Sequence, residues 1–236
     1  MKNVFGLALE SYWKGDRKTP YVIRRDDDHV DRESLGIYFT NRLYPIEKEI
    51  IASAKGKILD VGCGVGRHTL YFQKRGFDIS GVDISPKAIK VSKERGCRKV
   101  RVMDIYHAKF PPKSFDTILL FGHNIGIGGT LSGAEKLLKS LRKLIKINGV
   151  LLLTTVDVTK TKNKIHKEYH KRCRTAGRYI GSVKMRIEYK DHVSNWFLWL
   201  HIEPKELNKI AKETNWKILK MAHQKSGQYA AVLQAI

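Results

Sequence analysis

A glycine-rich turn between an apolar strand and a helical segment is the feature that most restricts the fold of this chain. Residues 57–61 (KILDV) have the apolar character of a buried strand, residues 62–66 (GCGVG) are rich in glycine, and residues 67–75 follow a helical pattern. Short apolar runs and helical segments keep alternating up to residue 156, which is typical of βαβ units around a parallel sheet. The sequence therefore predicts a doubly wound α/β fold.

The remaining elements complete a sheet of seven strands. Ser85-Pro86 is a helix start with a capping residue followed by proline, and Asn148-Gly149 is expected to turn the chain into the fifth strand. The last two predicted strands are adjacent in the sequence, so we expect a mostly parallel sheet with an antiparallel edge hairpin. Strands are predicted at 57–61, 77–82, 99–103, 116–121, 150–156, 217–222 and 228–235, with further strands near 183–189 and 196–200 and helices at 41–54, 134–145 and 204–214.

The charge of the chain points to an anionic partner. Its 236 residues include 45 Lys and Arg against 23 Asp and Glu, a formal net charge of +22, and 42% hydrophobic residues are enough for a sizeable core. An excess of basic residues favours nucleic acid or an anionic small substrate, although basic surfaces also occur on proteins that bind nothing acidic. The basic residues are densest at 160–190, where eleven Lys or Arg stand against two acids.

Several classes of protein are not expected. No run approaches the roughly 18 consecutive apolar residues of a membrane helix, and the start of the chain lacks the pattern of a signal peptide. We therefore expect a soluble, cytoplasmic protein without a membrane partner. Three cysteines with no Cys-x-x-Cys pair suggest neither a disulfide framework nor a zinc site, and no metal is expected.

Acidic residues end three consecutive predicted strands. Asp60, Asp83 and Asp104 occupy these positions, and ligands of doubly wound sheets bind outside the carboxyl ends of the strands. A carboxylate after the second strand can accept hydrogen bonds from a ribose diol. The glycine turn departs from the Gly-x-Gly-x-x-Gly pattern of nicotinamide-dependent enzymes, because Arg67 stands at the third glycine position.

This ordered set resembles the class I S-adenosylmethionine-dependent methyltransferases. The resemblance is carried by residues 58–68 (ILDVGCGVGRH), 81–85 (GVDIS) and 102–105 (VMDI), and it covers roughly 57–156 and the last thirty or so residues. It implies an enzyme that uses S-adenosyl-L-methionine and releases S-adenosyl-L-homocysteine, with the glycine loop at the methionine part, the second acid at the ribose and the third at the adenine. The cofactor-binding residues that it implies are Asp60, Gly62, Cys63, Gly64, Gly66, Asp83, Ile84, Asp104, Ile105 and Phe121.

The loop after the fourth strand is where this family places the transferable methyl group. Residues 121–129 contain no proline, so the Asn/Asp-Pro-Pro-aromatic motif of amino-directed nucleic-acid methyltransferases is missing, and no cysteine follows a proline as carbon methylation of cytosine requires. His123 and Asn124 are the catalytic candidates. His123 is a general base if the acceptor must lose a proton, and packing against the cofactor or facing solvent is an equally good interpretation.

Two segments outside the cofactor motifs are expected to bind the acceptor. We predict an N-terminal helical lid at 1–55 and a methyltransferase domain at 56–236 with a basic substrate-cap insertion at about 158–195. The alternative for the basic side chains is a solvated charged face. The candidate substrate-binding residues of the insertion are His166, Tyr169, His170, Arg174 and Arg178, of which Arg174 and Arg178 share a face if the segment is helical.

The predicted function is methyl transfer by direct displacement to a small, anionic acceptor. The alternative is methylation of RNA, either tRNA or rRNA, which the charge favours and the missing RNA-binding appendage disfavours. A third hypothesis is a cofactor-binding or nucleic-acid-binding protein without catalytic activity.

Overall fold

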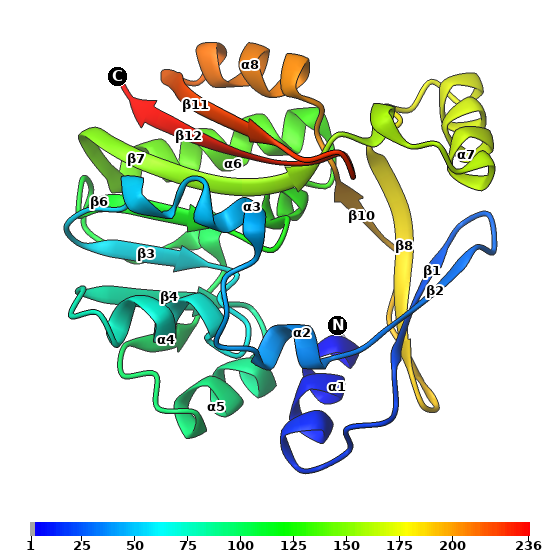
Figure 1. The fold of residues 1–236 in the computed structure, drawn as a ribbon, viewed down its shortest axis with the longest axis horizontal. Helices are drawn as coiled ribbons and strands as arrows, with labels where there is room; N and C mark the ends of the chain where they lie inside the picture. Colours follow the sequence, from blue (N-terminus) through cyan, green and yellow to red (C-terminus); the bar gives the residue numbers. More distant parts are fainter. Residues whose placement is uncertain (1–2) are drawn as a thin grey trace. The chain divides into compact units, whose positions relative to one another are not determined.

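The structure, a computed structural model, describes residues 3–236. Within these residues the chain forms two β-sheets, one of seven strands and one of five (Figure 1). The strand order of the larger sheet is β11-β12-β7-β6-β3-β4-β5. β6 runs parallel to β7 and β4 parallel to β5, whereas β12 is antiparallel to both β7 and β11. The predicted mostly parallel sheet with an antiparallel edge hairpin is confirmed.

The strands of the larger sheet follow the predicted alternation closely. Their bounds are β3 Ile58–Val61, β4 Ile79–Asp83, β5 Val100–Val102, β6 Phe115–Leu120, β7 Ile145–Val156, β11 Trp216–His223 and β12 Gln228–Ala235.

The smaller sheet joins the N-terminal segment to the basic insertion. Its order is β10-β8-β1-β2, with β9 added to β8, and β1 is antiparallel to both β2 and β8. The N-terminal segment, expected to be helical, thus also contains a β-hairpin. The bounds are β1 Tyr21–Arg25, β2 Val30–Glu33, β8 Ser182–Tyr189, β9 His192–Val193 and β10 Phe197–Leu200.

Helices connect most of these strands. Ser85 caps α5 as predicted, because its hydroxyl accepts a hydrogen bond from the backbone N–H of Ala88 at 3.0 Å. The helices are α1 Val4–Trp13, α2 Gly36–Phe39, α3 Pro45–Lys48, α4 Arg67–Gln73, α5 Pro86–Glu94, α6 Leu131–Leu144, α7 Lys164–Thr175 and α8 Pro204–Glu213, with short 3-10 turns η1 Ile51–Ser53, η2 Ile105–His107, η3 Asn124–Gly128 and η4 Val158–Lys160.

The chain divides into two compact units. The first contains Met1–Arg42, Leu59–Ala108 and Lys184–Phe197, and the second contains Leu43–Ile58, Lys109–Val183 and Leu198–Ile236. The N-terminal segment is shared between the two units, which divide between Arg42 and Leu43, and the domain boundary at residue 55 stays a prediction. The first unit therefore holds the glycine turn and the strand-end acids, and the second holds the loop after β6.

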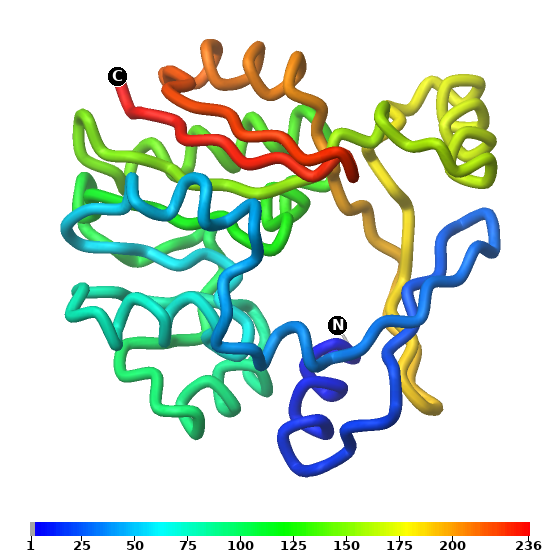
Figure 2. Tube along the Cα trace, viewed as in Figure 1, coloured from blue at the N-terminus to red at the C-terminus, as the bar shows by residue number. Residues whose placement is uncertain are grey.

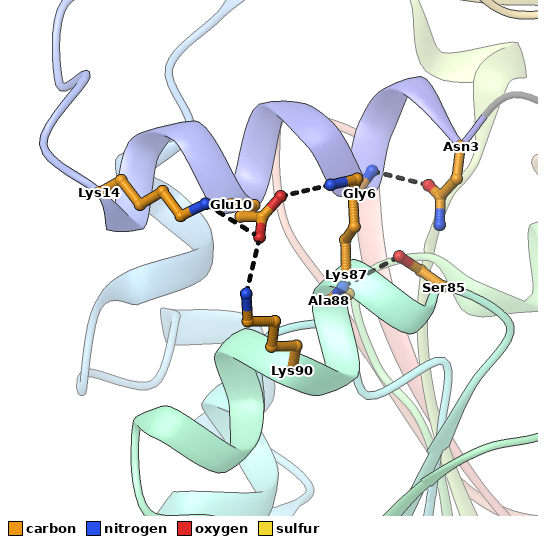
Figure 3. Close-up of polar contacts among 8 residues, drawn as sticks. All are labelled: Asn3, Gly6, Glu10, Lys14, Ser85, Lys87, Ala88 and Lys90. Carbon is orange, nitrogen blue, oxygen red and sulfur yellow. Dashed lines mark hydrogen bonds and ion pairs between the residues drawn. The ribbon is translucent and has the colours of Figure 1, made fainter.

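In the first unit, α1 packs closely on α5. Glu10 of α1 forms ion pairs with Lys87 at 2.5 Å and with Lys90 at 3.3 Å (Figure 3). Gly6 makes this approach possible, since a Cβ there would lie 2.3 Å from the hydroxyl oxygen of Ser85 and 2.7 Å from the side chain of Asn3. The N-terminal helix is therefore fixed against the segment that directly follows Asp83.

In the second unit, the apolar stripe predicted for residues 134–145 forms the buried face of α6. β7 lies beside β12, which lies beside β11 (Figure 2), and the indole of Trp216 donates a hydrogen bond to the carbonyl of Leu138 at 3.3 Å. The buried residues of α6 are Ala134, Leu137, Leu138, Leu141 and Leu144. The spacing of these five residues is the signal that identified the helix.

Two predicted elements are wrong in detail. The helix expected at 41–54 is reduced to α3 and η1, because Pro45 stands at the first helical position and Ile50 leaves the helical region with φ of −123°. The turn expected at Asn148-Gly149 lies inside β7, where Asn148 has φ of 62°. The register between β6 and β7 shifts there, so the residues form a bulge rather than a turn.

None of the helices formed by residues 3–236 is long and apolar enough to cross a membrane.

Candidate functional site

The glycine turn after β3 is held open by positive backbone angles. Gly62, Gly64 and Gly66 have φ of 70°, 52° and 81°, a region that side chains disfavour. The backbone N–H groups of Gly62 and Cys63 both donate to the carbonyl of Val82, at 2.8 and 3.0 Å. A Cβ on Gly64 would meet nothing within 4 Å. The turn is therefore fixed to β4 while its middle leaves room for a ligand beside the backbone.

Gly66 has a packing role in the same turn. A Cβ at this position would lie 2.3 Å from the sulfur of Cys97 and 2.9 Å from the hydroxyl oxygen of Ser92, which belongs to α5. α4 begins at the next residue, so its N-terminus lies at the end of the turn. A helix N-terminus favours anionic groups.

Asp83 joins the end of β4 to both neighbouring loops. Its Oδ2 accepts a hydrogen bond from the N–H of Gly64 at 2.9 Å, and its Oδ1 accepts one from the N–H of Ser85 at 2.8 Å. Burial raises the pKa of the Asp83 carboxyl. Each carboxylate oxygen keeps a second lone pair, so a diol can still be bound. Ile84 beside it is 68% exposed, an apolar surface at the end of the strand.

Asp104 follows β5 in the same manner. It caps η2 by accepting a hydrogen bond from the N–H of Tyr106 at 3.0 Å, and its other oxygen lies 2.9 Å from Nδ1 of His107. The side chain is half-exposed. Ile105 is buried, whereas Tyr106 is 38% exposed, so Tyr106 is the larger accessible surface at this position and was missed in the sequence.

The side chains of Asp60 and Cys63 are buried and contact other parts of the protein. Asp60 is 2% exposed and accepts a hydrogen bond from the hydroxyl of Thr69 at 2.7 Å. Burial raises the pKa of this carboxyl, against the opposing effects of His68 and Thr69. The thiol of Cys63 is also buried, and burial raises its pKa well above the usual value. The side chain of Cys63 is therefore part of the core rather than a reactive thiol, and its predicted role beside the cofactor stays a prediction.

These residues suit the nucleoside cofactor expected from the sequence. The open backbone at Gly64, the two strand-end acids and the exposed Ile84 all belong to the first unit. Together they offer hydrogen-bond acceptors for ribose hydroxyls and an amino group, and an apolar surface for a flat ring. Among residues 3–236 there is no group of three or more His, Cys, Asp or Glu side chains able to hold a metal ion.

The loop after β6 belongs to the second unit. Phe121 is 1% exposed, so its side chain is part of the core, and its predicted role in cofactor binding stays a prediction. The N–H of Gly122 donates to the hydroxyl of Thr154 at 3.1 Å. His123 has φ of 64° and its carbonyl accepts from the N–H of Gly126 at 2.8 Å. Asn124 begins η3 and is partly exposed.

His123 faces a second histidine that the sequence did not indicate. The ring centroids of His123 and His201 are 5.6 Å apart with an interplanar angle of 80°. Burial lowers the pKa of His123, and burial together with the charge of His123 lowers the pKa of His201 to about 3. Nδ1 of His201 is buried without a hydrogen-bond partner among the described residues. Both rings are therefore neutral at physiological pH.

Trp199 fixes the loop that carries His123. A Cβ on Gly126 would lie 2.2 Å from the indole of Trp199, and one on Gly129 would lie 3.1 Å from the carbonyl of Leu198. Two glycines of the loop thus lie directly against β10, the strand that leads into His201. The signal for this contact was the glycine content of residues 122–129, which alone does not identify the partner.

The predicted substrate-binding residues of the insertion are only partly accessible. Tyr169 and His170 are buried, Tyr169 in a cluster with Cys173 and Ile180. Arg178 lies beyond the end of α7, with its guanidinium 5.9 Å from the ring of Tyr169. Arg174 and Arg178 therefore do not share a helix face as expected, because the helix ends before Gly177. His166 is partly exposed and Arg174 is exposed.

A solved methyltransferase structure is similar to this chain over its whole length. A methyltransferase from Bacteroides fragilis, solved in complex with S-adenosyl-L-homocysteine, is 26% identical and superposes with a TM-score of 0.85. The alignment covers 100% of this chain and 96% of the other. The similarity thus extends over the smaller sheet and the insertion as well as the larger sheet.

Comparisons of sequence give the same family over a shorter segment. Residues 59–153 match the family model described as a methyltransferase domain. A demethylmenaquinone methyltransferase from Tropheryma whipplei is 31% identical over 105 residues, which is 42% of this chain and 44% of the relative. A 23S rRNA uracil methyltransferase from Pyrococcus abyssi is 28% identical over 114 residues, 40% and 27% of the two chains. The chain matches less than half of the length of these relatives. Residues 59–153 therefore form a methyltransferase domain, and the chain shares its fold with S-adenosylmethionine-dependent methyltransferases.

Proposed function

We propose that this protein transfers a methyl group from S-adenosylmethionine to a small, anionic acceptor by direct displacement. The observation that carries the proposal is the arrangement in the first unit, where Asp83 and Asp104 end neighbouring strands and Asp83 is hydrogen-bonded to the open turn at Gly64. The bound S-adenosyl-L-homocysteine of the Bacteroides fragilis relative supports the choice of ligand. The cofactor supplies a methyl group on a sulfonium whose leaving group is a neutral thioether.

In this proposal each strand-end residue binds one part of the cofactor. Asp83 accepts hydrogen bonds from the ribose hydroxyls, and Asp104 accepts one from the adenine amino group. Ile84 covers one face of the adenine, and the backbone at Gly64 lies beside the methionine part. Hydrogen bonds within the chain fix Asp83, Asp104 and Gly64, so binding requires little rearrangement of these residues. Alignment of the acceptor with the methyl group then supplies much of the acceleration.

His123 is the proposed general base for an acceptor that must lose a proton. A neutral imidazole accepts a proton, and burial keeps His123 neutral by lowering its pKa. The unpartnered Nδ1 of His201 favours the tautomer with the proton on Nε2, because a buried N–H without a partner costs more than a buried lone pair. His201 in this form is a donor that helps to orient the neighbouring ring or the acceptor.

Calorimetry with S-adenosyl-L-homocysteine tests the cofactor site. Asp83→Ala is expected to weaken binding at least about 10-fold, because charged hydrogen bonds contribute about 1.5–3 kcal/mol each. Asp78→Ala is the matched control: Asp78 stands at the other end of the same strand, where it pairs with Lys99 at 2.7 Å, and its loss should leave the affinity unchanged. If the wild-type protein does not bind S-adenosyl-L-homocysteine, the enzyme hypothesis is wrong.

Methylation of RNA is the second candidate function. The exposed basic side chains of α7 favour it, and so does the rRNA methyltransferase among the relatives. All three cysteines are buried, so carbon methylation of a pyrimidine through a cysteine nucleophile has no support. The exposed basic residues of the helix are Lys164, Lys167, Lys171, Arg172 and Arg174.

A salt series separates the two candidates. Binding of total tRNA in gel shifts should weaken steeply with salt if many phosphates are neutralised, and Arg172→Gln together with Arg174→Gln should reduce that slope. Transfer of labelled methyl groups to small acids in the absence of RNA supports the favoured function. Binding of S-adenosyl-L-homocysteine without turnover on any acceptor would instead support the third hypothesis, a protein that binds the cofactor without catalysis.

A further inference from the structure

The two faces of the smaller sheet have different surroundings. On β1, Tyr21 and Ile23 belong to the apolar cluster that contains α1, and on β8 the same is true of Ile187 and Tyr189. Successive side chains of a strand point to opposite faces. The residues between them therefore lie on the other face, away from this cluster: Val22 and Arg24 on β1, and Arg186 and Glu188 on β8.

Two arginines on that face hold one carboxylate. Nε of Arg24 donates to Oε1 of Glu188 at 2.7 Å, and Nε of Arg186 donates to the same oxygen at 2.8 Å. Nη2 of Arg24 also lies 3.2 Å from Oε2, and Nη2 of Arg186 lies 2.7 Å from Oε1. Arg24 and Arg186 are opposite each other in the register of β1 and β8. The sheet thus fixes two guanidinium groups around a carboxylate.

The cluster retains positive charge and donors. Arg24, Arg186 and Glu188 together have a net charge of +1, and the charge of Asp28 also acts on Arg24. The pKa of Glu188 is lowered by Arg24 and then by Arg186, so the carboxylate stays ionised. Within residues 3–236 these contacts leave Nη1 of each arginine without a partner. The side chains of Arg24 and Arg186 are 28% and 30% exposed. Their remaining N–H groups can reach a ligand from solvent.

An aromatic ring lies beside the two arginines. The guanidinium of Arg186 lies 4.9 Å from the ring centroid of Trp196, which is a favourable cation–π distance, and Trp196 is 40% exposed. Arg32 of β2 is exposed and is opposite Val22 in the register, so it adds positive charge to the same face. The face therefore combines anion recognition with a flat apolar surface.

We propose that Arg24, Arg186 and Trp196 form the binding site for an aromatic carboxylate. Glu188 shows that the spacing of the two guanidinium groups suits a carboxylate, which arginine binds through paired hydrogen bonds. The site lies on the face away from the cluster that contains α1 and Val65 of the glycine turn, so it is a ligand site separate from the proposed cofactor site.

Calorimetry with 4-hydroxybenzoate and with 4-hydroxybenzamide, in the absence of cofactor, tests the site. The wild-type protein should bind the carboxylate at least about 10-fold more tightly than the neutral amide, since a charge-assisted hydrogen bond is about twice as strong as a neutral one. Arg186→Gln should remove that preference. Arg98→Gln removes the same charge at an exposed position before β5 and should keep it.

Glu188→Gln should strengthen binding of the carboxylate, whereas a misfolded variant would bind it more weakly. Glutamine keeps only a neutral acceptor at this position, so the internal hydrogen bonds weaken and the charge of the site rises. Binding of 4-hydroxybenzoate should therefore tighten about 3-fold or more. Equal affinity for acid and amide, tighter binding of inorganic phosphate, or weaker binding by Glu188→Gln would each overturn the proposal. Binding of S-adenosyl-L-homocysteine by all variants, measured separately, shows whether the cofactor site is intact.

Discussion

The strand-end loops of the first unit and the histidine pair of the second unit satisfy their polar groups in different ways. In the loops, both oxygens of Asp83 accept hydrogen bonds from backbone N–H groups, and Asp104 accepts one from Tyr106. In the pair, Nδ1 of His201 is buried without a partner among the described residues, and His123 has a positive φ. Unpaired buried groups and strained backbone both cost stability. Under the proposed function, this difference matches loops that are preformed for a ligand and histidines that take part in the chemistry.

The largest expected effect is the loss of His123. If this residue is the general base, His123→Ala lowers kcat about 100-fold or more, because general base catalysis contributes about 10²–10⁴-fold. Affinity for S-adenosyl-L-homocysteine should not change. Since burial lowers the pKa of His123, the wild-type rate should rise with pH and reach its plateau below the ordinary titration range of histidine. Unchanged turnover in steady-state assays would assign His123 a packing role.

The second prediction tests how firmly the loops are fixed. Gly6→Ala places a methyl group 2.3 Å from the hydroxyl of Ser85, which follows Asp83 and caps α5. Overpacking of this kind costs about 1–3 kcal/mol. Helix propensity alone predicts the opposite sign, because alanine in a helix is about 0.5–1 kcal/mol better than glycine. Thermal unfolding with calorimetry decides between them, and a more stable variant would show that α1 is not tightly fixed on α5.

The third prediction concerns His201. His201→Phe removes an unpaired buried nitrogen, so the variant should be as stable as the wild-type protein at neutral pH. Turnover should fall about 10-fold, as expected for the loss of one neutral hydrogen bond of about 0.5–1.5 kcal/mol. The folded pKa of His201 is about 3, below the unfolded value of 6.5. The unfolded state therefore binds more protons between these pH values, and wild-type stability falls as pH drops through that window. Denaturant unfolding at several pH values should show that this fall is smaller in the variant.

The two regions also differ in how far the sequence predicts them. Asp60, Asp83, Asp104 and the three glycines lie within short motifs at strand ends, so their positions follow from the strand assignment alone. His201 lies in the connection between β10 and α8, and its pairing with His123 depends on tertiary packing of Trp199 on Gly126. No local pattern records such a contact, so the sequence indicated one histidine and missed the other.

Errors in the predicted elements have local physical causes. Pro45 must begin a helix, so the predicted helix at 41–54 cannot extend through it. Asn148 takes up a positive φ within a strand, where the sequence indicated a turn. The basic insertion was treated as one charged segment, but α7 buries Tyr169 and His170 while β8 presents Arg186. The alternation of side chains between the two faces of β8 identifies the face of Arg186 only when the pairing of β8 with β1 is known.

The smallest expected effect concerns the surface that fixes α1. Glu10 is surrounded by Lys87, Lys14 and Lys90, and hydrogen bonds from Lys87 and Lys14 lower its pKa to about 2 from a usual 4.5. A lowered carboxyl pKa stabilises the folded state above the unfolded value, and this contribution disappears as pH falls toward 2. The three lysines are 44–63% exposed, so solvent screening limits the effect to less than about 1 kcal/mol. Glu10→Gln should flatten the pH dependence of the unfolding free energy between pH 4.5 and 2. Salt at about 1 M shortens the screening length to about 3 Å, so it should reduce the difference in unfolding free energy between variant and wild type. An equal slope in both proteins would mean that packing around Gly6, and not charge, holds α1 beside the cofactor loops.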